Sequence, residues 1–267
     1  AFRAETPGHS IDMSRVELPM MFNLHHPLNL EVIGAEAQHD NMQSAAYRVI
    51  WGFLRKCPAS KVRFCIFDPK EGGGSVRMLS NFVNKMPDSY KRAVTQMSRT
   101  EELLSCLKEL EGQTLDFIRD RPDYDDLLDY NAHNPRRTEA ITLLMLYDFP
   151  LNADARCLEL LSSVMQKGNR CGIYVVLCRN TAVEVASSYD HIDEKLAELE
   201  KNCVQIECKE NGFALLPYHL SVRLIEKPDA GQLEKFAVEY HKAVEKLSVQ
   251  SIHFEEILPP EPFQGST

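Results

Sequence analysis

Apolar and polar residues alternate along this chain in blocks that predict strands and helices in turn. Segments rich in apolar residues predict strands at residues 28–33, 62–67, 140–147 and 172–178. The nearly continuous runs at 140–147 and 172–178 are typical of strands buried on both faces of a parallel sheet. Stretches with apolar residues at helical spacing cover residues 42–56, 76–84, 100–121 and 153–167. Strands that alternate with helices predict an α/β fold with a central, mostly parallel sheet flanked by helices.

The remainder of the chain is predicted to complete this domain and then to leave it. Further elements are expected as a helix at 192–201, strands at 203–208, 212–216 and 222–225, and a helix at 229–247. Residues 120–134 are acidic and are interpreted as turns. Residues 1–27 lack a strong period and are interpreted as an N-terminal extension or edge strand. Three prolines mark residues 248–267 as a linker, so the domain is assigned to residues 28–247.

Composition favours a single globular domain and argues against a DNA-binding surface, a zinc site and a disulfide framework. With 267 residues, 44% of them hydrophobic and 26% charged, the chain suits one sizeable domain. Its net charge of −9 lacks the basic excess that a DNA-gripping surface usually shows. The eight cysteines include no C-x-x-C pair, which argues against a zinc site and a disulfide framework. Free cysteines are typical of a reducing cytosol.

The chain carries no signal for membrane insertion or secretion. No apolar run is long enough to span a bilayer, and no secretory signal opens the sequence. We therefore expect a cytoplasmic location, with any membrane tether in other parts of a longer protein. We expect a fragment because the chain begins with Ala1 and because Gly265-Ser266-Thr267 forms no closing element.

The first apolar strand leads into a turn with the frame of a phosphate-binding loop. A working loop reads G-x-x-x-x-G-K-[ST] between a strand and a helix. Counted from Gly34, the second glycine is replaced by His39, the lysine by Asp40 and the hydroxyl residue by Asn41. A carboxylate at Asp40 repels the phosphates that a lysine holds. The sequence therefore keeps the frame of a nucleotide-binding loop without its chemistry.

Three further segments accompany this loop. The strand at 62–67 is followed by Asp68-Pro69-Lys70, the run at 143–147 ends in Asp148-Phe149, and residues 166–178 lead to Arg179 and Asn180. In their order and spacing, the four segments resemble the motor domain of the FtsK/SpoIIIE branch of RecA-like ATPases, over residues 28–225. Residues 254–260 also resemble the connector that leads into another motor domain in tandem members.

The resemblance implies a RecA-like P-loop NTPase fold with a degenerate active site. Asp148 survives at the Walker B aspartate, but Phe149 stands in place of the glutamate that polarises the attacking water. Arg179 and Asn180 stand at sensor-like positions. We therefore expect no catalytic residue, no metal site and no bound cofactor in this chain, with ATP and magnesium only in a neighbouring domain of the full-length protein.

The resemblance also implies the partners. They would be other ATPase domains of the same chain or ring, in a motor that moves DNA or exports protein, as type VII secretion ATPases do. This fragment would act by packing against those domains, with no hydrolysis of its own.

Two alternatives stay open from the residues alone. Asp40, Asp148 and His39 would lie at the strand ends and could bind a metal that hydrolyses a phosphoester. A loop that still presents backbone amides could instead bind ADP without hydrolysing nucleotide, as a regulatory domain. In a simpler interpretation, Gly34 is only a turn, Asp148 only caps the next helix, and Asp68 and Lys70 only form a surface ion pair.

Overall fold

One mixed sheet organises the molecule. The computed structural model describes residues 3–6, 9–12, 29–69, 84, 86, 88–183, 192–210, 212–216, 219–222, 224 and 229–249. The main sheet contains β3 (Asn29–Gly34), β4 (Val62–Phe67), β5 (Val94–Met97), β6 (Ile141–Phe149), β7 (Ile173–Asn180), β8 (Cys203–Lys209), β9 (Gly212–Leu215) and β10 (Leu220–Val222). Their spatial order is β10-β9-β8-β3-β7-β6-β4-β5.

The six strands from β8 to β5 are parallel, and only β9 and β10 are antiparallel additions at one edge. A separate antiparallel pair, β1 (Arg3–Thr6) and β2 (His9–Asp12), lies near the start of the chain. The predicted α/β fold with a mostly parallel sheet is therefore confirmed. Because the carboxyl ends of parallel strands share one edge, β3, β6 and β7 bring their last residues together there.

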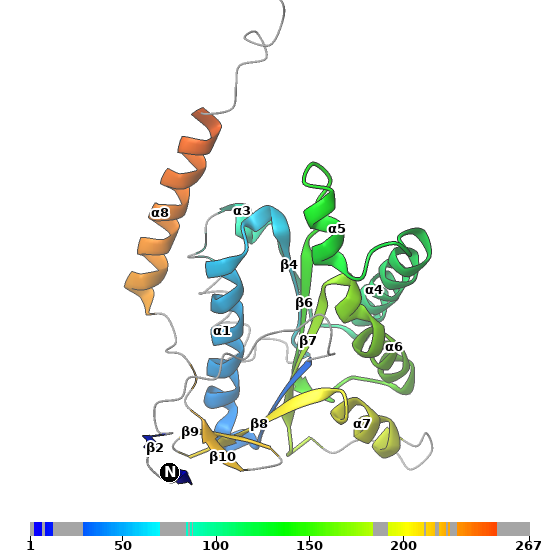
Figure 1. The fold of residues 1–267 in the computed structure, drawn as a ribbon. Coiled ribbons are helices and arrows are strands. Elements are labelled where there is room, and N and C mark those ends of the chain that lie inside the picture. Colours follow the sequence, from blue (N-terminus) through cyan, green and yellow to red (C-terminus); the bar gives the residue numbers. More distant parts are fainter. Residues whose placement is uncertain are drawn as a thin grey trace, which may run out of the picture.

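Helices cover both faces of this sheet, as Figure 1 shows. They are η2 (Glu36–Gln38), α1 (His39–Lys56), η3 (Ala59–Lys61), α3 (Asp88–Lys91), α4 (Thr100–Asp120), α5 (Leu127–His133), α6 (Ala155–Lys167), η4 (Gly168–Cys171), α7 (Ile192–Glu200) and α8 (Ala230–Val249). Helices α1 and α8 lie on one face, while α4, α6 and α7 lie on the other. No helix of the described residues combines the length and the apolar character that crossing a bilayer requires.

Two hydrophobic cores result, one on each face of the sheet. Alternate residues of the central strands, such as Val32 and Met145, pack under α1. The residues between them, such as Leu144 and Val175, pack under α4 and α6. This explains the continuous apolar runs of the sequence, because each central strand must bury both of its faces.

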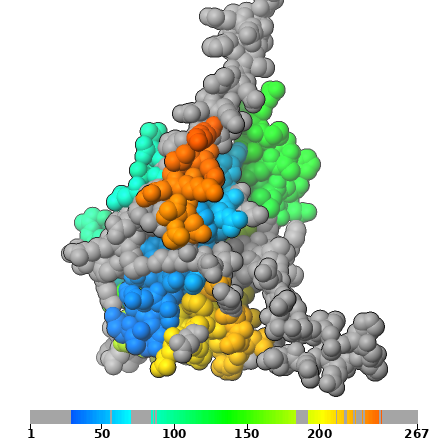
Figure 2. Space-filling view, turned by 90° about the vertical axis from the view of Figure 1, so that its left-hand side faces the viewer, coloured from blue at the N-terminus to red at the C-terminus, as the bar shows by residue number. Residues whose placement is uncertain are grey.

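Helix α8 is held onto the first core by aromatic side chains. Trp51 of α1 meets Phe236 with ring centroids 5.3 Å apart, and Tyr90 meets Tyr240 at 4.9 Å. Figure 2 shows α8 lying across this side of the molecule, beside α1. Such ring pairs add to the free energy gained from burial alone, so the last described helix belongs to the domain.

Several predicted boundaries were wrong. Helix α1 begins at His39, three residues before the predicted start, because η2 turns the chain directly into it. The acidic segment predicted to be turns contains α5, and the unpredicted β5 pairs with β4. The last short strand is residues 220–222, in place of the predicted 222–225. Residues 76–83 of the helix predicted at 76–84 and residues 250–267 of the linker predicted at 248–267 lie outside the described residues, while residues 248 and 249 belong to α8. Of residues 1–27, interpreted as an N-terminal extension or edge strand, the structure describes β1 and β2, which pair with each other outside the main sheet.

Candidate functional site

The candidate site lies where β3, β6 and β7 end. Gly34 closes β3, Asp148 lies near the end of β6, and Asn180 is the last residue of β7. Gly34 is paired with Asn180 in the sheet register, and Thr181 donates its backbone N–H to the Gly34 carbonyl over 2.9 Å. The structure therefore brings three of the positions singled out in the sequence into one place.

The turn after β3 is a tight one. The backbone N–H of Gln38 donates to the Ala35 carbonyl over 2.8 Å. The backbone N–H of Ala35 donates to the Gln38 side-chain oxygen over 2.9 Å. These two N–H groups are thus bonded within the turn, whereas a phosphate-binding loop directs its N–H groups at the ligand. Gly34 has a packing reason as well, because a Cβ there would lie 3.0 Å from Cγ of Met42.

A hydrogen-bonded group of polar side chains fills the end of β7. The Asn180 side-chain nitrogen donates to Oε2 of Glu36 over 2.8 Å and to Oδ1 of Asp148 over 2.9 Å. Its oxygen accepts the N–H of Ala182 over 3.0 Å. Asn180 and Asp148 are each only 2% exposed. One amide therefore joins the turn after β3 to the end of β6, and both of its N–H donors bond to carboxylates of the chain.

The end of β6 is distorted where it meets this group. Asp148 has φ of 47°, and the pairing of β6 with β7 shifts register between Leu146 and Phe149. A positive φ is uncommon outside glycine, although aspartate tolerates it better than most residues. The distortion places the Asp148 carboxylate beside Asn180 and 3.8 Å from Nδ1 of His39.

The three loop positions that replace the phosphate-binding residues take separate roles. The His39 ring stands with Nε2 2.8 Å from the Gln43 side-chain nitrogen. Asp40 is exposed in the first turn of α1, where the helix dipole favours a negative charge. The Asn41 side chain donates to the Lys209 carbonyl over 3.1 Å, which fastens α1 to β8.

Phe149 and Arg179 lie away from this group. Phe149 is 3% exposed and packs into the core under α4 and α6. Arg179 points to the same side of the sheet, where it pairs with Glu200 and lies 3.5 Å from the buried carboxylate of Glu31. Gln205 donates to the other oxygen of Glu31 over 2.8 Å. Of the two sensor-like positions, only Asn180 reaches Asp148.

Two residues of this region were missed in the sequence. Glu36 lies inside the loop frame, and its negative charge next to a phosphate-binding motif was a signal. Glu31 interrupts an apolar strand, and a charge in such a run usually marks a buried ion pair.

Buried acidic neighbours surround the strand ends on the α1 side. Burial raises the pKa of the Cys178 thiol, and the charges of Cys208, Asp148 and Asp68 raise it further. Asp68, at the end of β4, is 5% exposed. Lys70 lies outside the described residues, so the pairing of Asp68 with it stays a prediction.

A metal ion has no ready set of ligands here. The described residues contain no group of three histidine, cysteine or carboxylate side chains arranged to hold one. His39 and Asp148 lie together, with Nδ1 3.8 Å from Oδ1, whereas Asp40 is exposed. The metal-dependent phosphoester hydrolase stays a prediction.

Comparison with known proteins identifies the fold. No protein-family model matches the sequence, and the comparison with curated protein sequences also gives no match. Among solved structures, EssC (ATPases 2 and 3) from Geobacillus thermodenitrificans matches 88% of this chain with a TM-score of 0.53 and 11% identity. The chain has a RecA-like ATPase fold.

Two other similar structures support this assignment. The pCW3 conjugation coupling protein TcpA, solved with ATPγS, matches 78% of the chain at a TM-score of 0.52 and 12% identity. Thermomonospora curvata EccC (ATPases 2 and 3), in complex with a signal sequence peptide, matches 81% at 0.51 and 12% identity. The resemblance to FtsK/SpoIIIE-type ATPases is thus confirmed for the fold. The chain spans 46%, 53% and 42% of the EssC, TcpA and EccC chains.

Proposed function

We propose that this chain is a non-hydrolysing RecA-like module of a multidomain motor, and that it acts by packing against neighbouring ATPase domains. ATP and magnesium would bind in those neighbours and not here. The motor would be cytoplasmic and would move either DNA or an exported protein. The similarity to chains that contain several ATPase domains supports a module of this kind.

One observation carries the loss of catalysis. At the place where a RecA-like ATPase binds its nucleotide, Asn180 is bonded to two carboxylates of the chain itself, Glu36 and Asp148. A third carboxylate, Asp40, stands at the lysine position. A triphosphate brought here would meet negative charges in place of the cation that stabilises phosphoryl transfer.

The position of the catalytic base also offers no group that could activate water. The position of the catalytic glutamate is Phe149, whose ring is buried in the opposite core. An apolar ring can neither orient nor deprotonate a water molecule. The missing cation at the loop and the missing base at Phe149 are independent. Restoring the cation would therefore still leave the site without a base.

The test is a calorimetric titration of the chain with ATP and with ADP, each with and without magnesium. We expect no binding tighter than about 1 mM, the range of non-specific contacts, and no phosphate release above that of buffer. The same titration of a working P-loop ATPase provides the positive control. Micromolar binding of either nucleotide would refute the proposal and would favour the regulatory nucleotide-binding alternative.

The packing role needs the longer protein. Backbone amide hydrogen exchange should be slower at surface positions of this chain within the full-length protein than in the chain alone, because neighbouring domains cover them. Identical exchange in the two forms would contradict a packing role even if nucleotide binding is absent.

A further inference from the structure

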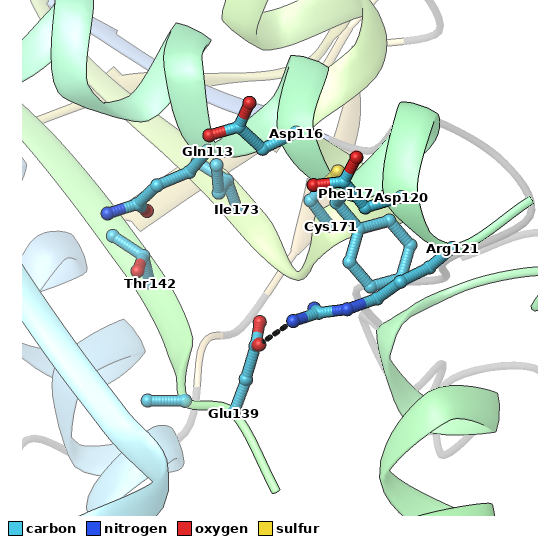
Figure 3. A pocket seen from close by; sticks show the side chains of 10 residues that line it. Gln113, Asp116, Phe117, Asp120, Arg121, Glu139, Thr142, Cys171 and Ile173 are labelled. Carbon is cyan, nitrogen blue, oxygen red and sulfur yellow. Dashed lines mark hydrogen bonds and ion pairs between the residues drawn. The ribbon is translucent and has the colours of Figure 1, made fainter. Parts of the chain in front are cut away.

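A second polar site lies at the opposite end of the sheet, where β6 and β7 begin. A cavity of about 200 Å³ opens there between the C-terminal half of α4 and the first residues of these two strands. Figure 3 shows Gln113, Asp116, Thr142 and Glu139 around it, with Arg121 at one side. Pockets for drug-sized ligands measure about 300–1,000 Å³. This cavity is too small for a nucleotide and suits a single side chain.

Each side-chain nitrogen donor group near this cavity already has one carboxylate partner. The Arg121 guanidinium pairs with Glu139 and lies over the ring of Tyr130, 4.2 Å from its centre. The Gln113 side-chain nitrogen donates one N–H to Glu109 over 3.0 Å and keeps a second, and its oxygen can accept. Arg119, outside the lining, donates one hydrogen bond to Asp116 and two to Asp120, and each carboxylate can accept more.

Thr142 provides an independent observation. The residue is 4% exposed and lines the cavity, yet its hydroxyl makes no hydrogen bond to any described residue. Buried polar side chains normally have a partner in the protein or in ordered water. The Thr142 hydroxyl is therefore available to a group that enters the cavity.

We propose that this cavity receives the side chain of a lysine presented by a neighbouring ATPase domain. Three carboxylates (Asp116, Asp120 and Glu139) and one guanidinium give the lining a net negative charge. An ammonium group has three donors and no acceptor, and therefore matches a lining that contains three carboxylates. Phe117 and Ile173 offer apolar surface to the methylene stem.

The inference deepens the proposed packing role, since it names one contact by which a neighbour would be held. It does not depend on whether this chain binds nucleotide. A lysine that enters the cavity would also stand near the amino ends of the strands, remote from Asn180. The neighbouring domain would thus bind this module at the end of the sheet opposite Asn180.

The cavity itself is tested by NMR titration with Nα-acetyl-lysine methylamide, with the Nε-acetylated form as the uncharged control. We expect shifts of the Thr142 and Ile173 amide signals with a dissociation constant of about 1–10 mM, the weak range suited to one side chain. Thr142→Val should weaken binding at least threefold without altering the fold, because it keeps the side-chain shape. The absence of shifts at these residues, or equal shifts with the acetylated form, would overturn the assignment of the cavity.

The partner is tested in the full-length protein with a carbodiimide, which joins a carboxylate directly to a lysine amine in contact with it. Mass spectrometry should find Asp116, Asp120 or Glu139 joined to a lysine of another ATPase domain. The triple variant D116N/D120N/E139Q should lose that product while other cross-links persist. Binding of the free lysine derivative without such a cross-link would overturn the neighbouring domain as the source. Nucleotide titration bears on neither result, so this inference and the loss of catalysis fail separately.

Discussion

The two ends of the sheet treat their polar groups in opposite ways. At the carboxyl ends of the strands, the Asn180 amide uses both of its N–H donors on Glu36 and Asp148. At the amino ends, Thr142 and Gln113 line a cavity with acceptors left over. The first end resembles a ligand site that the chain has filled with its own side chains, whereas the second has the character of a site that awaits a donor.

The strand order and the position of the first turn depend on buried apolar residues. Charge at the strand ends does not determine the fold. Under the proposed function, the role of the domain could therefore change without a change of topology. The following variants test each end in turn.

The largest effect is expected for Asn180→Leu. The buried Asp148 carboxylate would lose a charged hydrogen bond, and the free energy of unfolding should fall by about 2–4 kcal/mol. Urea unfolding monitored by circular dichroism measures it. Glu36→Ala should lower the free energy of unfolding less in the Asn180→Leu variant than in the wild type, because the two residues share one hydrogen bond. Additive losses would show that Glu36 and Asn180 do not act as a pair.

Gly172→Ala tests the amino end. Gly172 has φ of 72° just before β7, and an added Cβ would come 2.2 Å from Cδ2 of Leu127. Strained backbone of this kind costs about 1–3 kcal/mol, so the unfolding free energy should fall by that amount. Gly112→Ala is the matched control, because a Cβ within α4 meets nothing within 4 Å there. That change should stabilise the protein by about 0.5–1 kcal/mol.

Much of the carboxyl end could be predicted from the sequence, because apolar runs locate the strands and parallel strands end together. This reasoning placed His39, Asp40 and Asp148 at the strand ends, and the resemblance added Gly34 and Asn180. It did not find Glu36, whose contact with Asn180 depends on the tight turn of η2. It also did not separate Arg179 from Asn180. The structure shows them on opposite faces of the sheet, as adjacent residues of a strand are.

The amino end could not be predicted. Its cavity is formed by residues 113–121, 139–142 and 171–173, which are distant in sequence and singly resemble a helix surface or a strand start. Helix α5 was missed for a related reason. Its aspartates were interpreted as turn residues, yet Asp126 caps the helix by accepting the N–H of Asp129 over 2.9 Å.

Cysteine labelling compares how open the two ends are. Cys171 lines the cavity, and burial raises its pKa to about 11, whereas Cys178 is wholly buried near Asp148. In the native protein, iodoacetamide should modify Cys171 at least about ten times faster, which corresponds to about 1.4 kcal/mol in opening free energy. The rate should rise with pH up to pH 11, because the thiolate is the nucleophile. Equal rates would contradict the comparison, and unfolding in urea should equalise them as a control.

The smallest effect is expected for Asp40→Lys, which returns a cation to the lysine position of the loop. Asp40 is exposed in the first turn of α1, so reversal of its charge should cost only about 0.3–1 kcal/mol through the helix dipole. The same calorimetric titration should still find no ATP binding tighter than about 1 mM. The reason is that Asn180 would remain bonded to Glu36 and Asp148, and the N–H of Ala35 to Gln38. Micromolar binding by this single variant would mean that one charge, and not the filled end of the sheet, keeps nucleotide out.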